Sequence, residues 1–330
     1  APWSVGRQGV ASAGVGELAA LIAAMTWSAT SVGLTSLSAR TSPVVLSALR
    51  LGTATLVLPF ILWASGQAGD LADASPWTLA QVIGSGLVGY GIGDTIYILA
   101  LKRLGMQRTF PVSMALFISM TVVGGVLILD EPLTWGLPAG ALLIGAGIYL
   151  IVIPGQEPNR EAAHLAPADS AVEVPLEGPE SGAAMYAPPG PGGYALLVLV
   201  GVFWAAATLW LASAKGDLGA VAAGSIRTSA GAVALLAFAA TMQPRELRAP
   251  FRERGHILGI AAAGLAGTAF GSLMYVYAVV TAGAARTAVL SATSPLLALP
   301  LSMVFLGERF TRRIGAGTVL CVAGIVLVVV

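Results

Sequence analysis

The sequence predicts an all-α polytopic membrane protein, with ten transmembrane helices arranged as two inverted five-helix repeats around a central cavity. Three observations support this prediction: the composition, ten apolar runs of membrane-spanning length, and an internal repeat. Hydrophobic residues make up 56% of the 330 residues and charged residues 10%, whereas ordinary globular domains carry about 25% charged residues. The mean hydropathy of +0.84 is too high for the apolar side chains to be hidden in one water-soluble core.

The apolar runs are each about 20 residues long, which is enough for a helix to cross a hydrocarbon layer roughly 30 Å thick. They cover residues 16–37, 43–63, 76–99, 105–127, 135–153, 193–212, 218–241, 256–280, 284–305 and 312–330. Residues 154–192 are rich in Pro, Gly, Ala and Glu, a composition typical of a disordered or flexible linker. The chain therefore divides into an N-terminal tail (1–15), a first repeat (16–153), the linker and a second repeat (193–330).

The two halves of the chain repeat each other. Matching residues lie 177 or 178 positions apart: Trp27 and Trp204, Arg50 and Arg227, Tyr97 and Tyr275, Arg108 and Arg286, Glu131 and Glu308, and Thr134 and Thr311. This order over a whole half indicates an internal duplication of a five-helix unit. Because five is odd, the second copy must enter the membrane in the opposite direction, which gives an inverted repeat.

Glu131 and Glu308 occupy the same corner in the two repeats. Each ends one span close to the membrane surface, and a threonine follows three residues later, Thr134 or Thr311. We expect the threonine hydroxyl to cap the next helix by accepting a hydrogen bond from a free backbone amide. Substrate contact is the alternative role for the two glutamates.

Several short motifs occur in a fixed order along both halves. They are SALRLG (47–52) and GSIRTS (224–229) in the second helix of each half, ALKRLGMQRT (100–109) before the fourth helix, and LGERFT (306–311) near the end. Together with a tryptophan in the first helix of each half, this pattern resembles the ten-helix, EamA-type branch of the drug/metabolite transporter superfamily. The resemblance covers everything except the tail and the linker.

The resemblance implies a secondary transporter whose central cavity is lined mainly by helices one, three and four and their repeat partners six, eight and nine. It implies a small organic solute as the substrate: an amino acid, another metabolite or a drug-like compound. We expect a multi-pass protein of the plasma (inner) membrane without a signal peptide, because the first residues lack a basic segment followed by an apolar core.

Asp94, in GYGIGDTIY (89–97), is the most informative polar residue within a span. A charged side chain at membrane depth costs at least about 2.5 kcal/mol on insertion scales. The second half has Gly271 and Ser272 in the equivalent stretch, and an acid in one half only suits a proton or cation coupling site. The alternative is an acid buried for packing, against Arg108 or backbone donors.

Further site candidates are aromatic, basic and proline residues. Aromatic residues that suit the wall of an apolar pocket are Trp27, Tyr90, Tyr97, Trp204, Trp210, Tyr275 and Tyr277, although some of them would serve as interface anchors. Arg108 and Arg286 begin spans four and nine and are predicted to be gate or entrance residues. Arg50 and Arg227 lie inside spans two and seven, where they either extend toward the headgroups or clamp a carboxylate. Pro111 and Pro295 are predicted helix hinges.

Other function classes lack the residues that they need. Residues 91–94 match the GxGD of intramembrane aspartyl proteases, but the other aspartates lie in loops or at span ends, so a carboxylate pair is not expected. A single cysteine, Cys321, excludes an internal disulfide and a structural zinc site. His164 and His256 lie in the linker and at an interface, which removes a serine and histidine pair within the membrane, so we expect no enzyme activity, and likewise no cofactor or metal. No Walker sequence is present, so we expect transport without ATP, and no basic stripe is present, so we expect no nucleic acid. A non-transporting scaffold or receptor, with the linker as its partner site, is the alternative.

Basic residues outside the spans predict the orientation. The loops after the odd-numbered spans hold Arg40, Lys102, Arg103, Arg160, Arg245, Arg248, Arg252, Arg254, Arg309, Arg312 and Arg313. The opposite side holds only Arg7 and Lys215. The positive-inside rule therefore places the linker in the cytoplasm and both termini outside. The best-known members of the family that the chain resembles have cytoplasmic termini, so the two arguments predict opposite orientations.

Overall fold

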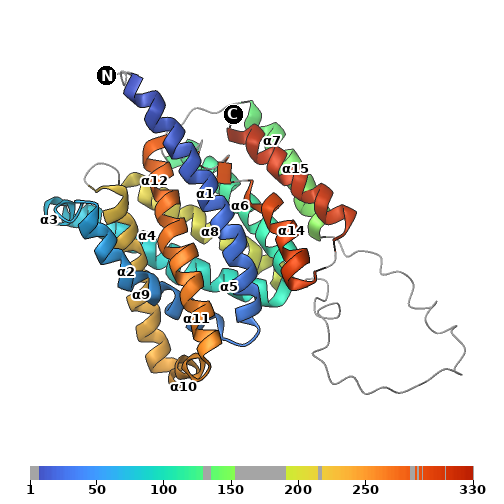
Figure 1. The fold of residues 1–330 in the computed structure, drawn as a ribbon. Coiled ribbons are helices and arrows are strands. Elements are labelled where there is room, and N and C mark those ends of the chain that lie inside the picture. Colours follow the sequence, from blue (N-terminus) through green and yellow to red (C-terminus); the bar gives the residue numbers. More distant parts are fainter. Residues whose placement is uncertain are drawn as a thin grey trace, which may run out of the picture.

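The computed structural model describes residues 7–128, 135–152, 191–214, 218–282, 287, 290–291, 293–308 and 310–329, and in these residues the chain forms helices joined by turns (Figure 1). The first-half helices are α1 (Arg7–Ser38), α2 (Pro43–Ala64), α3 (Asp70–Asp73), α4 (Pro76–Gly86), η1 (Leu87–Gly93), α5 (Asp94–Leu104), α6 (Met106–Ile128) and α7 (Gly136–Val152). The second-half helices are α8 (Pro191–Ser213), α9 (Ala220–Met242), α10 (Pro244–Arg248), η3 (Ala249–Arg252), α11 (Arg254–Ala263), η4 (Gly264–Gly271), α12 (Ser272–Ala282), α14 (Ser294–Leu306) and α15 (Arg312–Val329).

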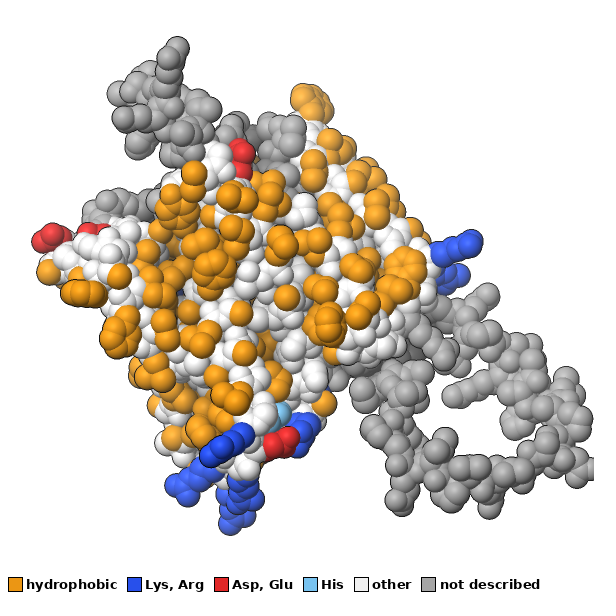
Figure 2. All heavy atoms as spheres, viewed as in Figure 1, with side chains coloured by type: hydrophobic (Ala, Val, Ile, Leu, Met, Phe, Trp, Pro, Cys, Tyr) orange, Lys and Arg blue, Asp and Glu red, His pale blue; other side chains and the backbone are white. Residues whose placement is uncertain are grey.

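Seven of the described helices are long and apolar enough to cross a membrane. They span Gly14–Ser38, Pro43–Ala64, Pro76–Leu104, Met106–Ile128, Gly192–Ser213, Ala220–Met242 and Arg254–Ala278. Figure 2 shows hydrophobic side chains spread over the flank of the bundle, with basic side chains gathered at its ends. One such end carries the exposed arginines 245, 248, 252 and 254, on α10, η3 and the start of α11. This distribution is that of an integral, multi-pass membrane protein.

Helices of the first half pack against their equivalents in the second half. The helix α2 packs on α9, and α7 packs on α15 along the edge of the bundle (Figure 1). The helix α1 contacts α12 and α14, and its repeat equivalent α8 contacts α5 and α6. Each of these contacts therefore has a counterpart when the two halves are exchanged.

Loop contacts fix the ends of the bundle. The loop between α1 and α2 contacts the end of α9 and the start of α11: the Ser42 hydroxyl donates to Gln243 Oε1 at 2.8 Å, and Thr41 Oγ1 lies 2.6 Å from His256 Nε2 in the first turn of α11. The loop between α2 and α4 contacts the segment before α9, where Gly219 N donates to Asp70 Oδ2 at 3.0 Å. These two loops leave opposite ends of α2. The loop between α1 and α2 and its repeat equivalent, the segment before α9, therefore lie at opposite ends of the bundle.

The third and eighth apolar runs are each interrupted by a π-helix, η1 and η4, at matching positions. Glycine permits close helix contacts at both. A Cβ added to Gly86 would lie 2.7 Å from the Arg227 Cα, and one added to Gly264 would collide with the Arg50 carbonyl oxygen. These two glycine-rich spans thus approach their neighbours closely, and the neighbours are the helices that carry the repeated arginines.

Glu308 caps a helix from across the molecule. Its carboxylate accepts hydrogen bonds from the backbone amides of Met106 at 2.8 Å and Gln107 at 3.0 Å, at the start of α6. Burial raises the pKa of Glu308, and the two amide donors oppose this by favouring the carboxylate. Thr311 Oγ1 accepts from Ile314 N at 3.2 Å, which confirms the predicted cap of the following helix. Glu131 and Thr134 lie outside the described residues.

We expect Glu308→Ala to lower the free energy of unfolding by about 1–2 kcal/mol, because two amides at a helix start lose their acceptor. Thermal unfolding of the purified protein in detergent would measure the change as a lower Tm. Glu253→Ala is the matched control, because Glu253 is an exposed glutamate paired with exposed Arg40. Equal Tm shifts in the two variants would contradict the capping role.

Candidate functional site

A cavity of about 100 Å³ lies between the two halves and has room for several water molecules. Its walls come from α1, α2, η1, α5 and α6 in the first half and from α8, α9, η4 and α12 in the second. The lining residues are Trp27, Thr30, Ser31, Leu34, Arg50, Gly89, Tyr90, Asp94, Tyr97, Phe110, Met114, Phe117, Trp204, Ala207, Thr208, Arg227, Gly267, Ser272 and Tyr275. Both repeats therefore contribute to one site.

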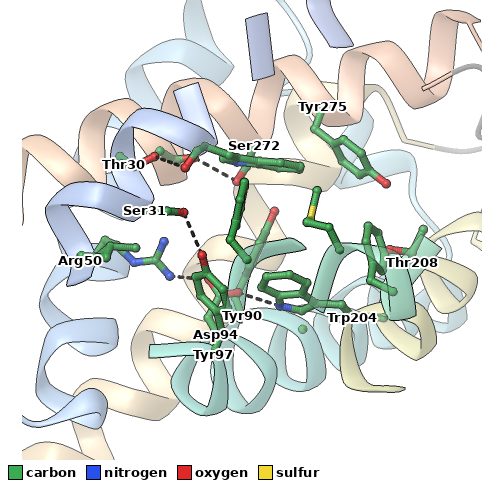
Figure 3. A pocket seen from close by; sticks show the side chains of 18 of the residues that line it. Thr30, Ser31, Arg50, Tyr90, Asp94, Tyr97, Trp204, Thr208, Ser272 and Tyr275 are labelled. Carbon is green, nitrogen blue, oxygen red and sulfur yellow. Dashed lines mark hydrogen bonds and ion pairs between the residues drawn. The ribbon is translucent and has the colours of Figure 1, made fainter. Parts of the chain in front are cut away.

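Asp94 is held by one residue from each half. It forms an ion pair with Arg50 of α2, and Trp204 Nε1 of α8 donates to Asp94 Oδ1 at 2.9 Å (Figure 3). Asp94 is 8% exposed and Arg50 is 7% exposed. A buried carboxylate or guanidinium without a partner destabilises the fold, and here each of the two groups is the partner of the other. The pair is a charged centre beside the aromatic rings of Tyr97 and Trp204.

This pairing corrects two sequence-based alternatives. Arg108 or backbone donors were the predicted packing partners of Asp94, but the charged partner is Arg50, while Arg108 is half-buried near the start of α6 and does not line the cavity. Extension of the Arg50 side chain toward the headgroups is also wrong, because Arg50 reaches inward to the acid. The helices α2 and α5 contact each other, and this crossing brings residues 44 positions apart together.

Two matching aromatic pairs form opposite walls of the cavity. The rings of Trp27 and Tyr275 lie 4.9 Å apart between centroids, and those of Trp204 and Tyr97 lie 5.0 Å apart. The Tyr97 hydroxyl donates to Ser31 Oγ at 2.9 Å. The Tyr275 hydroxyl points into the cavity toward Thr208, the repeat equivalent of Ser31 (Figure 3). The two-fold relation of the sequence repeats is thus preserved in the cavity walls.

The charged groups of the cavity break this relation. Arg227, the equivalent of Arg50, is 5% exposed and has Ser272 where Arg50 has Asp94. Its Cζ lies 4.9 Å from the centre of the Tyr90 ring, a cation–π contact. Its Nε is buried without a hydrogen-bond partner, and no described acid forms an ion pair with its guanidinium.

Six of the predicted site residues line the cavity together: Trp27, Tyr90, Asp94, Tyr97, Trp204 and Tyr275. Tyr277 does not, because two residues along a helix turn the side chain by about 200°, and Tyr277 lies 36% exposed on the far side from Tyr275. Arg286 lies outside the described residues. Pro111 is buried within α6. Pro295 is the second residue of α14, a position where the helix does not use the backbone N–H that proline lacks. Their roles as hinges stay predictions.

The sequence left the role of both cavity arginines open between extension toward the headgroups and a carboxylate clamp. Arg50 and Arg227 come from spans two and seven, which the family resemblance does not place among the main lining helices. The signal in the sequence was the 177-residue repetition of an arginine at membrane depth. Small polar lining residues such as Ser31 and Thr208 carried no signal that separates them from other serines and threonines inside helices.

Residues 14–153 and 191–330 match the model of the EamA-like transporter family. No match is found among curated proteins. A solved structure described as "Crystal structure of protein" is similar with a TM-score of 0.65 and 18% sequence identity, over 94% of this chain and 95% of that chain. At this identity the likeness concerns the fold.

Proposed function

Because the chain belongs to the EamA-like transporter family, whose members carry small solutes across membranes, we propose that it is a secondary transporter that moves a small organic solute by alternating access. The observation that carries this proposal is the cavity, since residues of both repeats line it and few of them are charged. Motion of one repeat against the other around such a site would expose it first to one side of the membrane and then to the other.

The proposed architecture has ten spans in two inverted repeats, with boundaries at 16–153 and 193–330 and a linker at 154–192. Support for the inversion comes from the loops: the first loops of the two repeats lie at opposite ends of the bundle. The matching π-helices and the reciprocal helix contacts agree with a two-fold relation between the repeats. Residues 129–134, 283–286, 288–289 and 292 lie outside the described residues, so the ends of two of the proposed spans are not described.

Asp94 is the proposed coupling site for protons. Its carboxylate lies in the cavity, in the first repeat only, and contacts groups of both repeats. A group that contacts both moving parts can change partner when they move, which is what coupling a proton to transport requires.

Flux assays would test the transport proposal. The purified protein in proteoliposomes would be given a panel of organic acids, amino acids, nucleosides, polyamines and cationic drugs, after a thermal-shift screen for binding. We expect saturable flux of at least one class without ATP. Binding of none and flux of none would instead favour a membrane scaffold or receptor.

Orientation in the plasma membrane is a separate prediction. Arg40 and Lys102 gather with the segment between α9 and α11 at one end of the bundle, and the positive-inside rule makes this end cytoplasmic. A single cysteine at Ser170 in the linker, in a Cys321→Ala background, should then resist an impermeant maleimide on intact cells and react after permeabilisation. A cysteine at Ser65, in the loop between α2 and α4, is the control that should react at once. The reverse pattern would mean that the orientation is opposite.

A further inference from the structure

We propose that Arg227 and Trp27 bind the carboxylate of the transported solute, so that the substrate class is small organic monocarboxylates with an apolar body. This inference rests on the proposed transport function. It starts from the unequal charges at matching positions in the two halves of the cavity.

At one position in the cavity, the Asp94 carboxylate accepts hydrogen bonds from two donors, one from each half of the chain. Asp94 accepts from the Arg50 guanidinium through one oxygen and from Trp204 Nε1 through the other. When the two repeats are exchanged, the equivalent donors are Arg227 and Trp27, which are of the same two types. The equivalent of the acid is Ser272, so this second pair of donors has no carboxylate between them.

The backbone geometry around the second pair of donors repeats that of the first. A Cβ added to Gly93, just before Asp94, would lie 3.1 Å from Trp204 Nε1. A Cβ added to Gly271, just before Ser272, would lie 3.2 Å from Trp27 Nε1. The indole therefore approaches the span in the same way on both sides. Among the described residues, neither Arg227 nor the Trp27 indole has a carboxylate acceptor.

The charge of the cavity favours an anion. Its lining holds two arginines and one aspartate, so it carries one positive charge in excess. A buried guanidinium without an anionic partner is costly, and Arg227 gains only the Tyr90 ring as a partner. A carboxylate fits a guanidinium with two parallel hydrogen bonds. One bound monocarboxylate would neutralise the site.

The rest of the lining selects the body of the solute. Leu34, Tyr90, Met114 and Phe117 present apolar or aromatic surface to the cavity, together with the two tilted aromatic pairs. A volume of about 100 Å³ limits the solute to a small molecule. The doubly charged phosphate monoesters are disfavoured, because a single unpaired arginine would leave one negative charge buried.

Matched ligand pairs test the charge requirement. Benzoate, phenylacetate, 3-phenylpropanoate and indole-3-acetate would be compared with their primary amides by calorimetry on the purified, detergent-solubilised full chain, with phenyl phosphate and phenethylamine as further probes. We expect at least one acid to bind about tenfold or more tightly than its amide, the effect of a charge-assisted hydrogen-bond pair. Equal affinities for acids and amides, stronger binding of the phosphate or the amine, or no binding of any acid would overturn the proposal.

Substitutions at one position test the location. Ser272→Asp places an internal carboxylate where the solute's carboxylate is proposed to lie, and Ser272→Asn places an uncharged group of the same shape there. We expect the Asp variant to bind the acids at least about tenfold more weakly than the Asn variant, and to have a higher Tm because Arg227 gains a partner. Arg227→Gln should lose the preference for acid over amide. Similar acid affinities in the Asp and Asn variants, with both folded by Tm, would overturn the assignment.

The binding experiments and the flux experiments test different proposals, so the failure of one can be distinguished from the failure of the other. Saturable flux of amines or neutral solutes, with no acid bound, would leave a transporter whose substrate class is different. Acid binding that depends on Arg227, without flux of any acid, would instead refute transport of acids and retain the binding site.

Discussion

Asp94→Asn is expected to abolish uptake driven by a pH gradient while solute exchange between two sides at equal pH is partly retained. An asparagine keeps the size of the side chain and an oxygen that accepts from the Trp204 indole, but it cannot gain or lose a proton. Proteoliposomes with an imposed pH gradient measure the first property, and counterflow of a preloaded solute measures the second. Any solute with saturable flux in the panel serves for both.

The same substitution also leaves Arg50 without its acid. Removing one partner of a buried ion pair costs about 3–5 kcal/mol, so a loss of folded protein could imitate a loss of coupling. The double variant Arg50→Gln with Asp94→Asn removes both charges and is the matched control. We expect its Tm to recover relative to Asp94→Asn, while pH-driven uptake stays absent. If either variant concentrates solute in response to the pH gradient as the parent does, Asp94 serves packing and the coupling site lies elsewhere.

Gly86→Ala is expected to lower the free energy of unfolding by about 2 kcal/mol or more, and to reduce solute binding. The added methyl group would lie 2.7 Å from the Arg227 Cα, so either the end of α4, where η1 begins, or the helix α9 must move. Either movement changes the position of the Arg227 side chain relative to the Tyr90 ring of η1, and with it the shape of the cavity. Thermal unfolding and ligand calorimetry would measure the two effects.

Gly33→Ala on α1 is the control for the glycine substitution. A Cβ at Gly33 meets no atom within 4 Å, and alanine favours the helix by about 1 kcal/mol relative to glycine. Its Tm should equal or exceed that of the parent. A Gly86→Ala protein with the parent's Tm would show that the contact between the end of α4 and α9 can relax without cost.

Much of the fold was predictable because each membrane helix satisfies its own backbone hydrogen bonds. Length and hydropathy of a run are then enough to identify a span, as for Pro43–Ala64 and Ala220–Met242. The family was likewise recognisable, since its short motifs occur in order in both halves. The two π-helices were not predictable, because the change from α to π bonding depends on neighbouring helices that the local sequence does not specify.

The sequence predicted several residues of the candidate site, but it did not predict which of them contact one another. Trp27 and Trp204 stood out because each is repeated in the other half, and both line the cavity. The sequence did not identify the partner of Asp94, because Arg108 is nearer in the sequence whereas Arg50 is nearer in the structure. The same limit applies to Glu308, whose acceptor role depends on the crossing of α14 and α6 rather than on its own motif.

Each π turn holds one residue more than the α turn that it replaces, so η1 and η4 each contain the equivalent of a one-residue insertion inside a span. Deletion of one residue there would close the turn to α geometry and keep the helices on both sides in phase. Deletion within an uninterrupted span such as α1 would rotate everything beyond it by about 100°. The two spans that present Asp94 and Ser272 to the cavity are therefore the ones whose length can change by a residue without loss of the fold. Variation in length, as well as substitution, can thus reshape this cavity.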